Sequence, residues 1–255
     1  MGYLHEGHLS LVSRAKKEND IVVASIFVNP LQFGPKEDYK RYPRDLGRDK
    51  RLLKKAGTHV LFLPQAKELY PPDFETLVSV KKLSRGLCGR TRPVHFAGVA
   101  TVVAKLLNLV VPHNLYLGLK DYQQFRVVSQ MVRDLHIPVK VVGCPIVREK
   151  DGLAMSSRNI FLSGAERRRA LSLSKALREA RRLVRAGQRR SKRLVLALRK
   201  VIDAGNGARV DYVEIVDAAA LGPVVQLRAG QKVLVAVAVY FSKTRLIDNC
   251  VINVK

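Results

Sequence analysis

The pattern His5-x-Gly7-His8 places two imidazole rings three residues apart, directly before a helical pattern that runs from Leu9 to Lys17. A helix N-terminus offers free backbone N–H groups and a partial positive charge, which together favour anions. Two histidines there can donate to the negative charge that develops on a transferring phosphoryl group, and a glycine lets the backbone approach a phosphate. The pattern indicates phosphoryl chemistry, although two surface histidines with a structural glycine also fit it.

A second polar run, residues 148–159, follows an apolar stretch that predicts a strand at residues 139–146. It contains two successive hydroxyls and a fork-shaped guanidinium, in Ser156, Ser157 and Arg158. These groups suit the oxygens of a polyphosphate. Because serine and asparagine also favour helix N-caps, a capping role is the alternative interpretation.

A third cluster is Gly118-Leu119-Lys120-Asp121, which follows a strand predicted at residues 114–117. Lys120 is a point charge that could reach a phosphate. Asp121 could instead be the N-cap of the helix predicted from Tyr122.

Amide side chains form the fourth cluster. Asn29 and Gln32 follow the apolar run at residues 21–28, and Gln124 lies on the helix after the third cluster. Their amide groups could orient a small polar acid, or could serve only as hydrogen-bond donors within loops.

The elements that must position these residues alternate along the first two-thirds of the chain. Apolar runs occur at residues 21–28, 59–63, 114–117 and 139–146, and helical patterns between them at residues 46–56, 99–110 and 122–135. This alternation predicts an α/β fold with a Rossmann-like parallel sheet whose strands are covered on both faces. Ligands bind such sheets beyond the carboxyl ends of the strands, where these polar clusters fall.

The last third has a different pattern. Two basic helical stretches, residues 163–186 and 191–204, precede strand-like runs at residues 210–216, 232–241 and 245–254. This order predicts a smaller C-terminal α+β domain. We therefore expect a Rossmann-like domain over residues 1–161 and an α+β lid domain over residues 162–255.

In such a sheet a strand should precede the His5–His8 turn, yet the sequence opens at Met1. An inner strand that buries about six apolar side chains contributes roughly 9–18 kcal/mol, at about 1.5–3 kcal/mol each. That rivals the net stability of a domain, about 5–15 kcal/mol. We therefore expect either a start upstream of Met1 or another element in the place of this strand.

The charge balance is strongly basic, with 46 Lys and Arg against 21 Asp and Glu, a net charge of +25. Such a chain attracts polyanions such as nucleic acids, anionic membranes or phosphorylated small molecules. Much of the charge lies between Arg167 and Lys200, on helices without aromatic residues that could stack on bases. A solvated arginine-rich surface is the preferred interpretation, so we expect no nucleic-acid partner. An RNA-binding module is the alternative.

Other features bear on location. No apolar stretch reaches 18 residues, so we expect no membrane span. Cys88, Cys144 and Cys250 are far apart and odd in number, which fits neither a disulfide framework nor a zinc cluster. No secretory leader opens the chain. We expect buried free thiols and a cytoplasmic protein.

The His5–His8 pattern resembles the HxGH signature of the nucleotidyltransferase superfamily, and the run ending at Asn159 is similar to its mobile KMSKS loop. More specifically, the chain resembles the pantothenate synthetase (pantoate–β-alanine ligase) family throughout its length, in the ordered segments HEGH, FVNPLQFG, DYKRYPR, GRTRPVHFAGV, GLKDYQQ, DGLAMSSRN and RLIDN. The resemblance implies an AMP-forming ligase that adenylates pantoate with MgATP and releases pyrophosphate. β-Alanine then attacks the pantoyl adenylate, which gives pantothenate and AMP.

Motif matching implies roles for individual residues. Catalytic groups that handle the ATP phosphates would be His5, His8, Lys120 and Arg158. The remaining ATP-binding residues would be Gly7, Gly118, Asp121, Val147, Met155, Ser156 and Ser157. Pantoate would be held by Met1, Gln32 and Gln124, and the β-alanine half of the site would be formed or supported by Asn29, Gln32, Tyr42, Arg92 and His95. The resemblance also implies a homodimer, with Mg²⁺ carried by ATP and no metal bound by the protein itself.

The sequence departs from the family pattern in three places. A strand and a Pro-Thr pair that normally precede Met1 are absent, which favours an upstream start. Leu119 stands where an acidic residue is usual, and Val94 where a glycine is usual, so the loop before His95 could shift. A different adenylyltransferase of the superfamily is the remaining alternative, but the contexts of Asn29, Gln32 and Gln124 favour pantoate.

Overall fold

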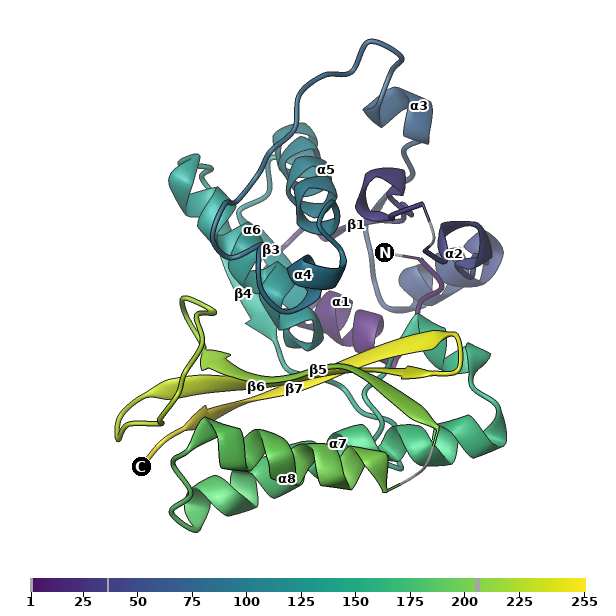
Figure 1. Cartoon of the computed structure of the whole chain (residues 1–255). Helices are drawn as coiled ribbons and strands as arrows, with labels where there is room; N and C mark the ends of the chain where they lie inside the picture. Colours follow the sequence, from purple (N-terminus) through teal and green to yellow (C-terminus); the bar gives the residue numbers. More distant parts are fainter. Residues whose placement is uncertain (1, 36, 205–206) are drawn as a thin grey trace. The chain divides into compact units, whose positions relative to one another are not determined.

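The computed structural model describes residues 2–35, 37–204 and 207–255 (Figure 1). By their contacts these residues form two compact units. The first runs to Val147 and includes Met155–Ser157, and the second comprises Arg148–Ala154 and Arg158–Lys255. The domains expected at residues 1–161 and 162–255 stay a prediction. In the structure, the tight turn Arg148–Ala154 packs with the second unit.

Parallel strands form the centre of the first unit. β1 (Val23–Ser25) pairs with β2 (Val60–Phe62), and β3 (Asn114–Gly118) pairs with β4 (Lys140–Cys144). Three of the four predicted apolar runs contain one of these strands, and β3 extends one residue beyond the fourth run, at residues 114–117. The predicted α/β class is confirmed, but the described strands make two parallel sheets of two strands each rather than one continuous sheet.

Burial on both faces, predicted for the strands, is wrong for β1 and β2. Val23 is 38% exposed and Val60 is 49% exposed. Side chains alternate along a strand, so Val22 and Ala24 face the core while Val23 lies on the opposite face. That core packs against one face only and includes Leu4, Val12 and Ala15 near helix α1 and Leu53 on helix α2.

Whether a strand is missing from this unit stays a prediction. Among the described residues, β1 pairs with β2 and β3 with β4, and no strand joins β1 to β3. The core around Leu4 nevertheless receives Ala24 from β1 and Tyr116 from β3. Side-chain packing therefore links the two sheets where no backbone pairing is described.

The helices of the first unit are α1 (Glu6–Glu18), α2 (Leu46–Lys55), α3 (Ala66–Leu69), α4 (Cys88–Thr91), α5 (His95–Val110) and α6 (Tyr122–Asp134). α5 and α6 lie side by side through Val99, Leu107, Val128 and Met131, and α1 packs on β3 (Figure 1). α5 begins four residues before the predicted start at Val99. Its first turn contains His95, a polar residue that is nevertheless buried.

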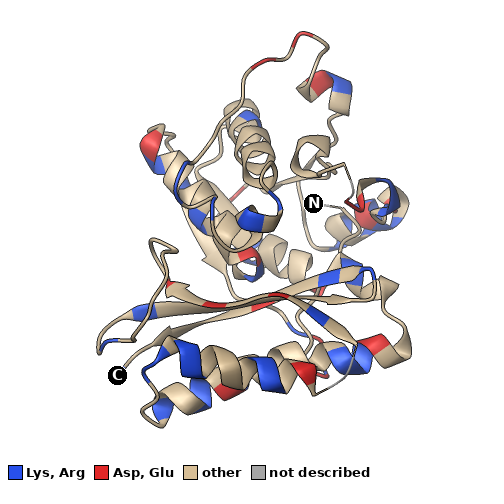
Figure 2. Cartoon of the chain, viewed as in Figure 1, with Lys and Arg blue, Asp and Glu red and all other residues tan. Residues whose placement is uncertain are grey.

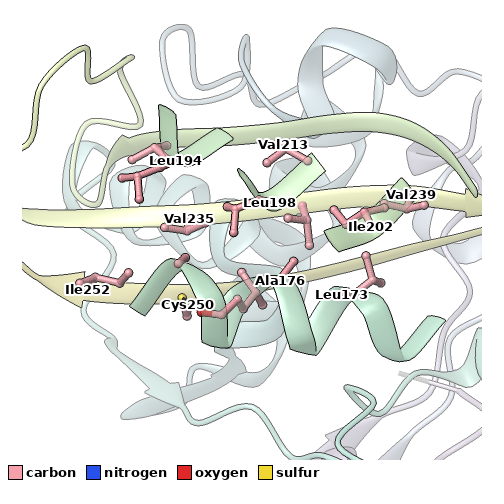
Figure 3. Packing of buried hydrophobic residues seen from close by; sticks show 14 of the residues in the cluster. Leu173, Ala176, Leu194, Leu198, Ile202, Val213, Val235, Val239, Cys250 and Ile252 are labelled. Atoms are coloured by element: carbon pink, nitrogen blue, oxygen red, sulfur yellow. Dashed lines mark hydrogen bonds between the residues drawn. The ribbon is translucent and has the colours of Figure 1, made fainter. Parts of the chain in front are cut away.

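The second unit is a helix pair on an antiparallel sheet, as predicted. α7 (Gly164–Arg185) and α8 (Ser191–Asp203) lie along one face of β5 (Ala208–Asp217), β6 (Lys232–Phe241) and β7 (Thr244–Asn253), in the order β5-β6-β7 (Figures 1 and 3). Because side chains alternate along β6, Val235 and Val239 point toward Leu173 of α7 and Leu198 of α8.

Cations cover the outer surface of this helix pair (Figure 2). Arg168, Lys175, Arg178, Arg182 and Arg185 are all exposed, and their spacing of seven, three, four and three residues puts them on one stripe of α7. The apolar residues of α7 are instead buried against the sheet. The predicted amphipathic, cationic helix is therefore present.

Two further expectations concern features outside the sheets. Cys88, Cys144 and Cys250 are buried free thiols, as predicted. No described helix has both the length and the apolar character that crossing a membrane requires.

Candidate active site

The two histidines of the first motif lie against each other at the start of α1. His5 is the N-cap residue, and the ring centroids of His5 and His8 are 4.0 Å apart. A Cβ at Gly7 would lie only 2.9 Å from the His5 ring, so the glycine makes room for this imidazole. The sequence predicts that Gly7 lets the backbone approach a phosphate. In the structure, the side chain nearest to Gly7 is the His5 ring.

The backbone N–H of His5 donates to Nδ1 of His8 over 3.4 Å. A ring nitrogen that accepts a hydrogen bond is unprotonated, so a neutral His8 carries its proton on Nε2. Burial, His5 and the Lys120 ammonium all hold the pKa of His8 well below its usual value. His8 is therefore neutral at pH 7 and can donate one hydrogen bond, and the structure brings His5, His8 and Lys120 together.

Lys120 lies in the 3₁₀ turn Leu119–Asp121 between β3 and α6. Asp121 occupies the N-cap position of α6, but its side chain makes no capping hydrogen bond. The capping alternative therefore gains no support. Leu119 packs against Gly143, where an added Cβ would be 2.8 Å away, so the residue that departs from the family pattern fills space beside β4.

The amide cluster after β1 is built around Asn29, which is only 2% exposed. Its Nδ2 donates to the Gly98 carbonyl at 3.0 Å and to Gln32 Oε1 at 3.4 Å. Its Oδ1 accepts from the Tyr70 hydroxyl at 2.8 Å and from the Leu31 N–H at 3.2 Å. Asn29 thus organises the loop, and its bond to Oε1 orients the Gln32 amide, whose nitrogen carries the donors.

Arg92 and the buried His95 form a cluster with the half-buried Glu37 and Gln32. The Arg92 guanidinium pairs with both Glu37 carboxylate oxygens and donates to the Gln32 carbonyl at 3.3 Å. His95 Nδ1 lies 3.0 Å from that same carbonyl, and its Nε2 lies 3.3 Å from Arg92 Nη1. Because a carbonyl only accepts, Nδ1 of His95 is the donor and Nε2 accepts from Arg92.

Burial, reinforced by Arg92, lowers the pKa of His95 to about 4. The ring is therefore neutral at pH 7 with both nitrogens hydrogen-bonded, so it is not a free general base. These contacts favour the supporting role for Arg92 and His95. Val94 is exposed, with φ −85° and ψ −14°, so valine in place of glycine brings no backbone strain.

The consecutive glutamines Gln123 and Gln124 differ in environment. Gln123 is buried, accepts the Cys88 N–H at 3.0 Å and donates to the Leu83 and Gly86 carbonyls at 2.9 and 2.7 Å. Gln124, the predicted pantoate residue, is half-buried. Gln123 therefore braces the 83–88 segment, and the pantoate contact of Gln124 stays a prediction.

The 148–159 loop contributes residues to both units. In the first, Met155 N–H donates to the Val147 carbonyl at 3.0 Å, and the Tyr42 hydroxyl donates to Ser157 Oγ at 3.3 Å. These bonds bring Tyr42, Val147, Met155 and Ser157 together. Arg158 belongs to the second unit, and Met1 lies outside the described residues.

The comparisons with known proteins decide the family. A sequence model of the family "Pantoate-beta-alanine ligase" matches residues 1–251. The chain belongs to the pantoate–β-alanine ligase family. The identification made from the sequence motifs is thereby confirmed, together with the ligase activity that it implied.

Relatives in this family are similar over almost the whole chain. The pantothenate synthetases of Thermotoga petrophila and Heliobacterium modesticaldum are each 55% identical, over 99% and 100% of this chain and 90% of their own lengths. A crystal structure of pantothenate synthetase from Thermus thermophilus has a TM-score of 0.93 and 51% identity, and covers 98% of this chain and 90% of that one.

A more distant ligase structure bears on the substrates. The Francisella tularensis pantoate–β-alanine ligase, described as complexed with beta-gamma ATP and β-alanine, has a TM-score of 0.79 and 36% identity. It covers 98% of this chain and 86% of its own. That ligase binds a nucleotide and an amino acid on the same fold.

Sequence reasoning missed several residues that hydrogen-bond to the segments carrying candidate site residues, namely Glu37, Asp49, Tyr70, Gln123, Arg167 and Asp248. One signal was available for Asp49. It lies four residues before Leu53, so an acidic residue shares the apolar face of a predicted helix. For the others, the contact partner lies far away in the sequence.

Among the described residues, no group of three or more His, Cys, Asp or Glu side chains is placed to hold a metal ion. That Mg²⁺ is carried by ATP, with no metal bound by the protein itself, stays a prediction.

Proposed function

We propose that this ligase condenses pantoate with β-alanine to form pantothenate through a pantoyl adenylate, with ATP converted to AMP and pyrophosphate. The observation that carries the proposal is the neutral His8 ring at the start of α1. This ring lies against His5, and the positive charge of Lys120 helps to lower its pKa. Membership of the pantoate–β-alanine ligase family supplies the substrates.

In the first step, a pantoate carboxylate oxygen attacks the α-phosphorus of MgATP and the bond to pyrophosphate breaks. Charge develops on the α-phosphoryl oxygens and on the leaving group. His8 Nε2–H, His5 and Lys120 donate to this charge, and Ser156, Ser157 and Arg158 bind the departing phosphates. A single donor of this kind contributes about 10²–10³ in rate.

The remaining proposed roles concern binding. Gly7, Gly118, Asp121, Val147 and Met155 line the nucleotide pocket. Pantoate is held by Gln32 and Gln124, with Met1 as a third proposed contact. The bond from Asn29 to Gln32 Oε1 supports this role, because it fixes the amide whose nitrogen would donate to the acid.

In the second step, the neutral amine of β-alanine attacks the acyl carbon, the acyl–oxygen bond to AMP breaks, and the amine proton is released. No enzyme nucleophile takes part. Asn29, Tyr42, Arg92 and His95 shape this half of the site. The hydrogen bonds that occupy both His95 nitrogens support a positioning role for that ring.

The homodimer rests on the family resemblance and the cytoplasmic location on the three free cysteines, and both belong to this proposal. Light scattering after gel filtration tests the first, since a dimer of a 28.5 kDa chain has twice that mass.

An assay of product release tests the reaction. With pantoate, ATP and Mg²⁺ alone, we expect one pyrophosphate per active site, followed by AMP release only when β-alanine is added. His8→Ala should slow pyrophosphate release about 10²–10³-fold. His113→Ala, at an exposed histidine outside the site, should leave it unchanged. AMP release that does not depend on β-alanine would overturn the proposal.

A further inference from the structure

Asp49 is a charged residue that the proposed reaction leaves without a part. It lies on α2 and is 1% exposed. Its Oδ2 accepts the backbone N–H of Tyr3 at 2.7 Å, and its Oδ1 accepts the N–H of Leu4 at 2.7 Å. Both carboxylate oxygens therefore bind the two residues that immediately precede His5.

The neighbouring Arg48 holds the same segment from its other side. Its Nη1 donates to the Leu4 carbonyl at 2.7 Å, and its guanidinium lies 5.1 Å from the centre of the Tyr3 ring. Leu4 is itself 0% exposed. The backbone of Tyr3 and Leu4 and the Tyr3 ring thus all contact Arg48 and Asp49, which are consecutive residues of α2.

This segment needs such a restraint. Tyr3 has φ +48°, a left-handed conformation that is unfavourable for a residue with a side chain. Such a conformation persists only where the surroundings over-determine it. His5 follows directly as the N-cap of α1. The backbone dihedral angles of Tyr3 and Leu4 therefore determine where the His5 and His8 rings lie.

A purely structural interpretation explains the carboxylate less well. Burying a charge costs several kcal/mol, and an apolar residue of similar size often stabilises such a position equally or better. A carboxylate that accepts two successive N–H groups at 2.7 Å does what no apolar side chain can. Its contacts point to a requirement for a fixed backbone before His5.

We propose that Asp49 is a positioning residue for the adenylation step, which acts through the backbone of Tyr3 and Leu4 to place His5 and His8. This inference rests on the proposed function of the two histidines. Asp49 does not touch substrate, because both of its oxygens are committed to backbone N–H groups.

Asp49→Asn tests the proposal. An asparagine has one acceptor oxygen and turns an N–H donor toward the second backbone N–H, so one of the two bonds is lost. A shift of about 1 Å at a catalytic group can cost about 10²-fold in rate. We expect pantoate-dependent exchange of pyrophosphate into ATP to slow about 10–100-fold, with the KM for β-alanine unchanged.

Leu53→Ala is the matched control. Leu53 lies one turn further along α2, is 2% exposed and packs in the same core, but it makes no hydrogen bond to the Tyr3–Leu4 segment. Truncating this buried leucine leaves a cavity and lowers the stability of the fold. At a temperature where both variants are folded by circular dichroism, we expect near-wild-type exchange for Leu53→Ala. Equal losses in the two variants would show a general stability effect and overturn the proposal.

A double-mutant cycle with His5→Ala separates action through the histidine from an independent effect. If Asp49 works through the two histidines, Asp49→Asn costs less once His5 is alanine than it costs in the wild type, because linked residues are not additive. If the effects of Asp49→Asn and His5→Ala on the exchange rate simply multiply in the double variant, the proposal is overturned.

Imidazole proton shifts give a readout without activity. We expect those of His5 and His8 to move in Asp49→Asn but not in Leu53→Ala. Unmoved shifts in Asp49→Asn would overturn the inference. If the shifts move while His5→Ala and His8→Ala keep full exchange, the positioning is upheld and the proposed function of the histidines fails.

Discussion

The guanidinium of Arg148 holds the carboxylate of Asp248 through two hydrogen bonds of 2.7 and 3.0 Å, across 100 residues of sequence. Asp248 is 2% exposed and lies on β7, and Arg148 also donates to the Gly152 carbonyl at 3.1 Å. This pair fixes the start of the 148–159 loop to the sheet of the second unit.

A second set of bonds fixes the rest of that loop. Arg167 of α7 pairs with Glu149 at 2.6 Å and with Asp151 at 2.7 Å. Asn159 Nδ2 donates to Glu149 at 2.6 Å and to the Ala154 carbonyl at 3.1 Å. The loop that carries the proposed phosphate contacts is therefore braced at both of its ends.

We predict that Asp248→Asn weakens ATP binding. The substitution removes the charge that holds Arg148, and hydrogen bonds to charged groups contribute about 1.5–3 kcal/mol. We expect a loss of about 2 kcal/mol in the free energy of unfolding and a several-fold rise in the KM for ATP, measured by urea titration and steady-state kinetics.

The ion pair between Asp211 and Arg245, 2.7 Å long and in the same sheet, supplies the control. Asp211→Asn should cost similar stability and leave the KM for ATP unchanged, because this pair links β5 to β7 and the Arg148–Asp248 pair stays in place. The same rise in KM for both variants would contradict the assigned role of Asp248.

The buried His95 predicts how stability depends on pH. Its pKa is about 4 in the folded chain against about 6.5 when unfolded, so between these values the unfolded chain binds one more proton. The free energy of unfolding should therefore fall as the pH drops from about 6.5 to about 4, by roughly 3 kcal/mol from this group, and no further below.

His95→Gln should remove that part of the pH dependence, since glutamine does not titrate. The exposed His113 provides the comparison, and His113→Gln should keep the wild-type slope. Urea titrations at several pH values measure all three proteins. A slope in His95→Gln that matches the wild type would show that His95 is not the group responsible.

Gly98 predicts a link between helix packing and the pantoate contact. A Cβ at this position would lie 2.4 Å from the Leu31 carbonyl oxygen and 2.6 Å from the Gln32 backbone nitrogen. Gly98→Ala must therefore push α5 away from the turn that carries Gln32. Overpacking of this kind costs about 1–3 kcal/mol, and we expect a raised KM for pantoate as well.

Gly86→Ala is the corresponding control, because no heavy atom lies within 4 Å of an added Cβ there. Its KM for pantoate and its urea midpoint should stay near the wild-type values. If Gly98→Ala and Gly86→Ala have the same KM for pantoate, the packing of α5 does not determine how Gln32 binds this substrate.

The cationic stripe of α7 predicts an unusual response to salt. With a net charge of +25, repulsion among like charges opposes the compact state. Raising NaCl from about 10 mM to about 150 mM shortens the Debye length from about 30 to about 8 Å. We expect the Tm to rise over this range.

Neutralising Lys175, Arg178 and Arg185 together with glutamine should raise the Tm at low salt and flatten its salt dependence. Differential scanning calorimetry measures both effects. A wild-type Tm that falls with added salt would mean that attractive ion pairs outweigh the repulsion.

Much of the fold could be predicted because apolar periodicity is a local property of the sequence. β6 has the predicted bounds, and α8 ends one residue before its prediction. The exposure of Val23 could not be predicted, because a continuous apolar run does not show how many strands lie beside it.

The site could be predicted by residue type but not by contact. The sequence alone does not distinguish the roles of Gln123 and Gln124. Only the structure shows that Gln123 hydrogen-bonds to the 83–88 segment. The partner of Asp49 lies 45 residues away, and that of Arg148 lies 100 residues away. Spacing along the chain does not reveal such pairs.

The long span between Arg148 and Asp248 also has a consequence for protein synthesis. The ribosome releases the loop residues well before β7, so a nascent chain has Arg148 long before it has the carboxylate that holds it. The start of the loop is anchored to the sheet only when β7 has joined it. A premature stop codon shortly before Asp248 would therefore spare every proposed substrate contact and still leave Arg148, at the start of the 148–159 loop, without the carboxylate that holds it.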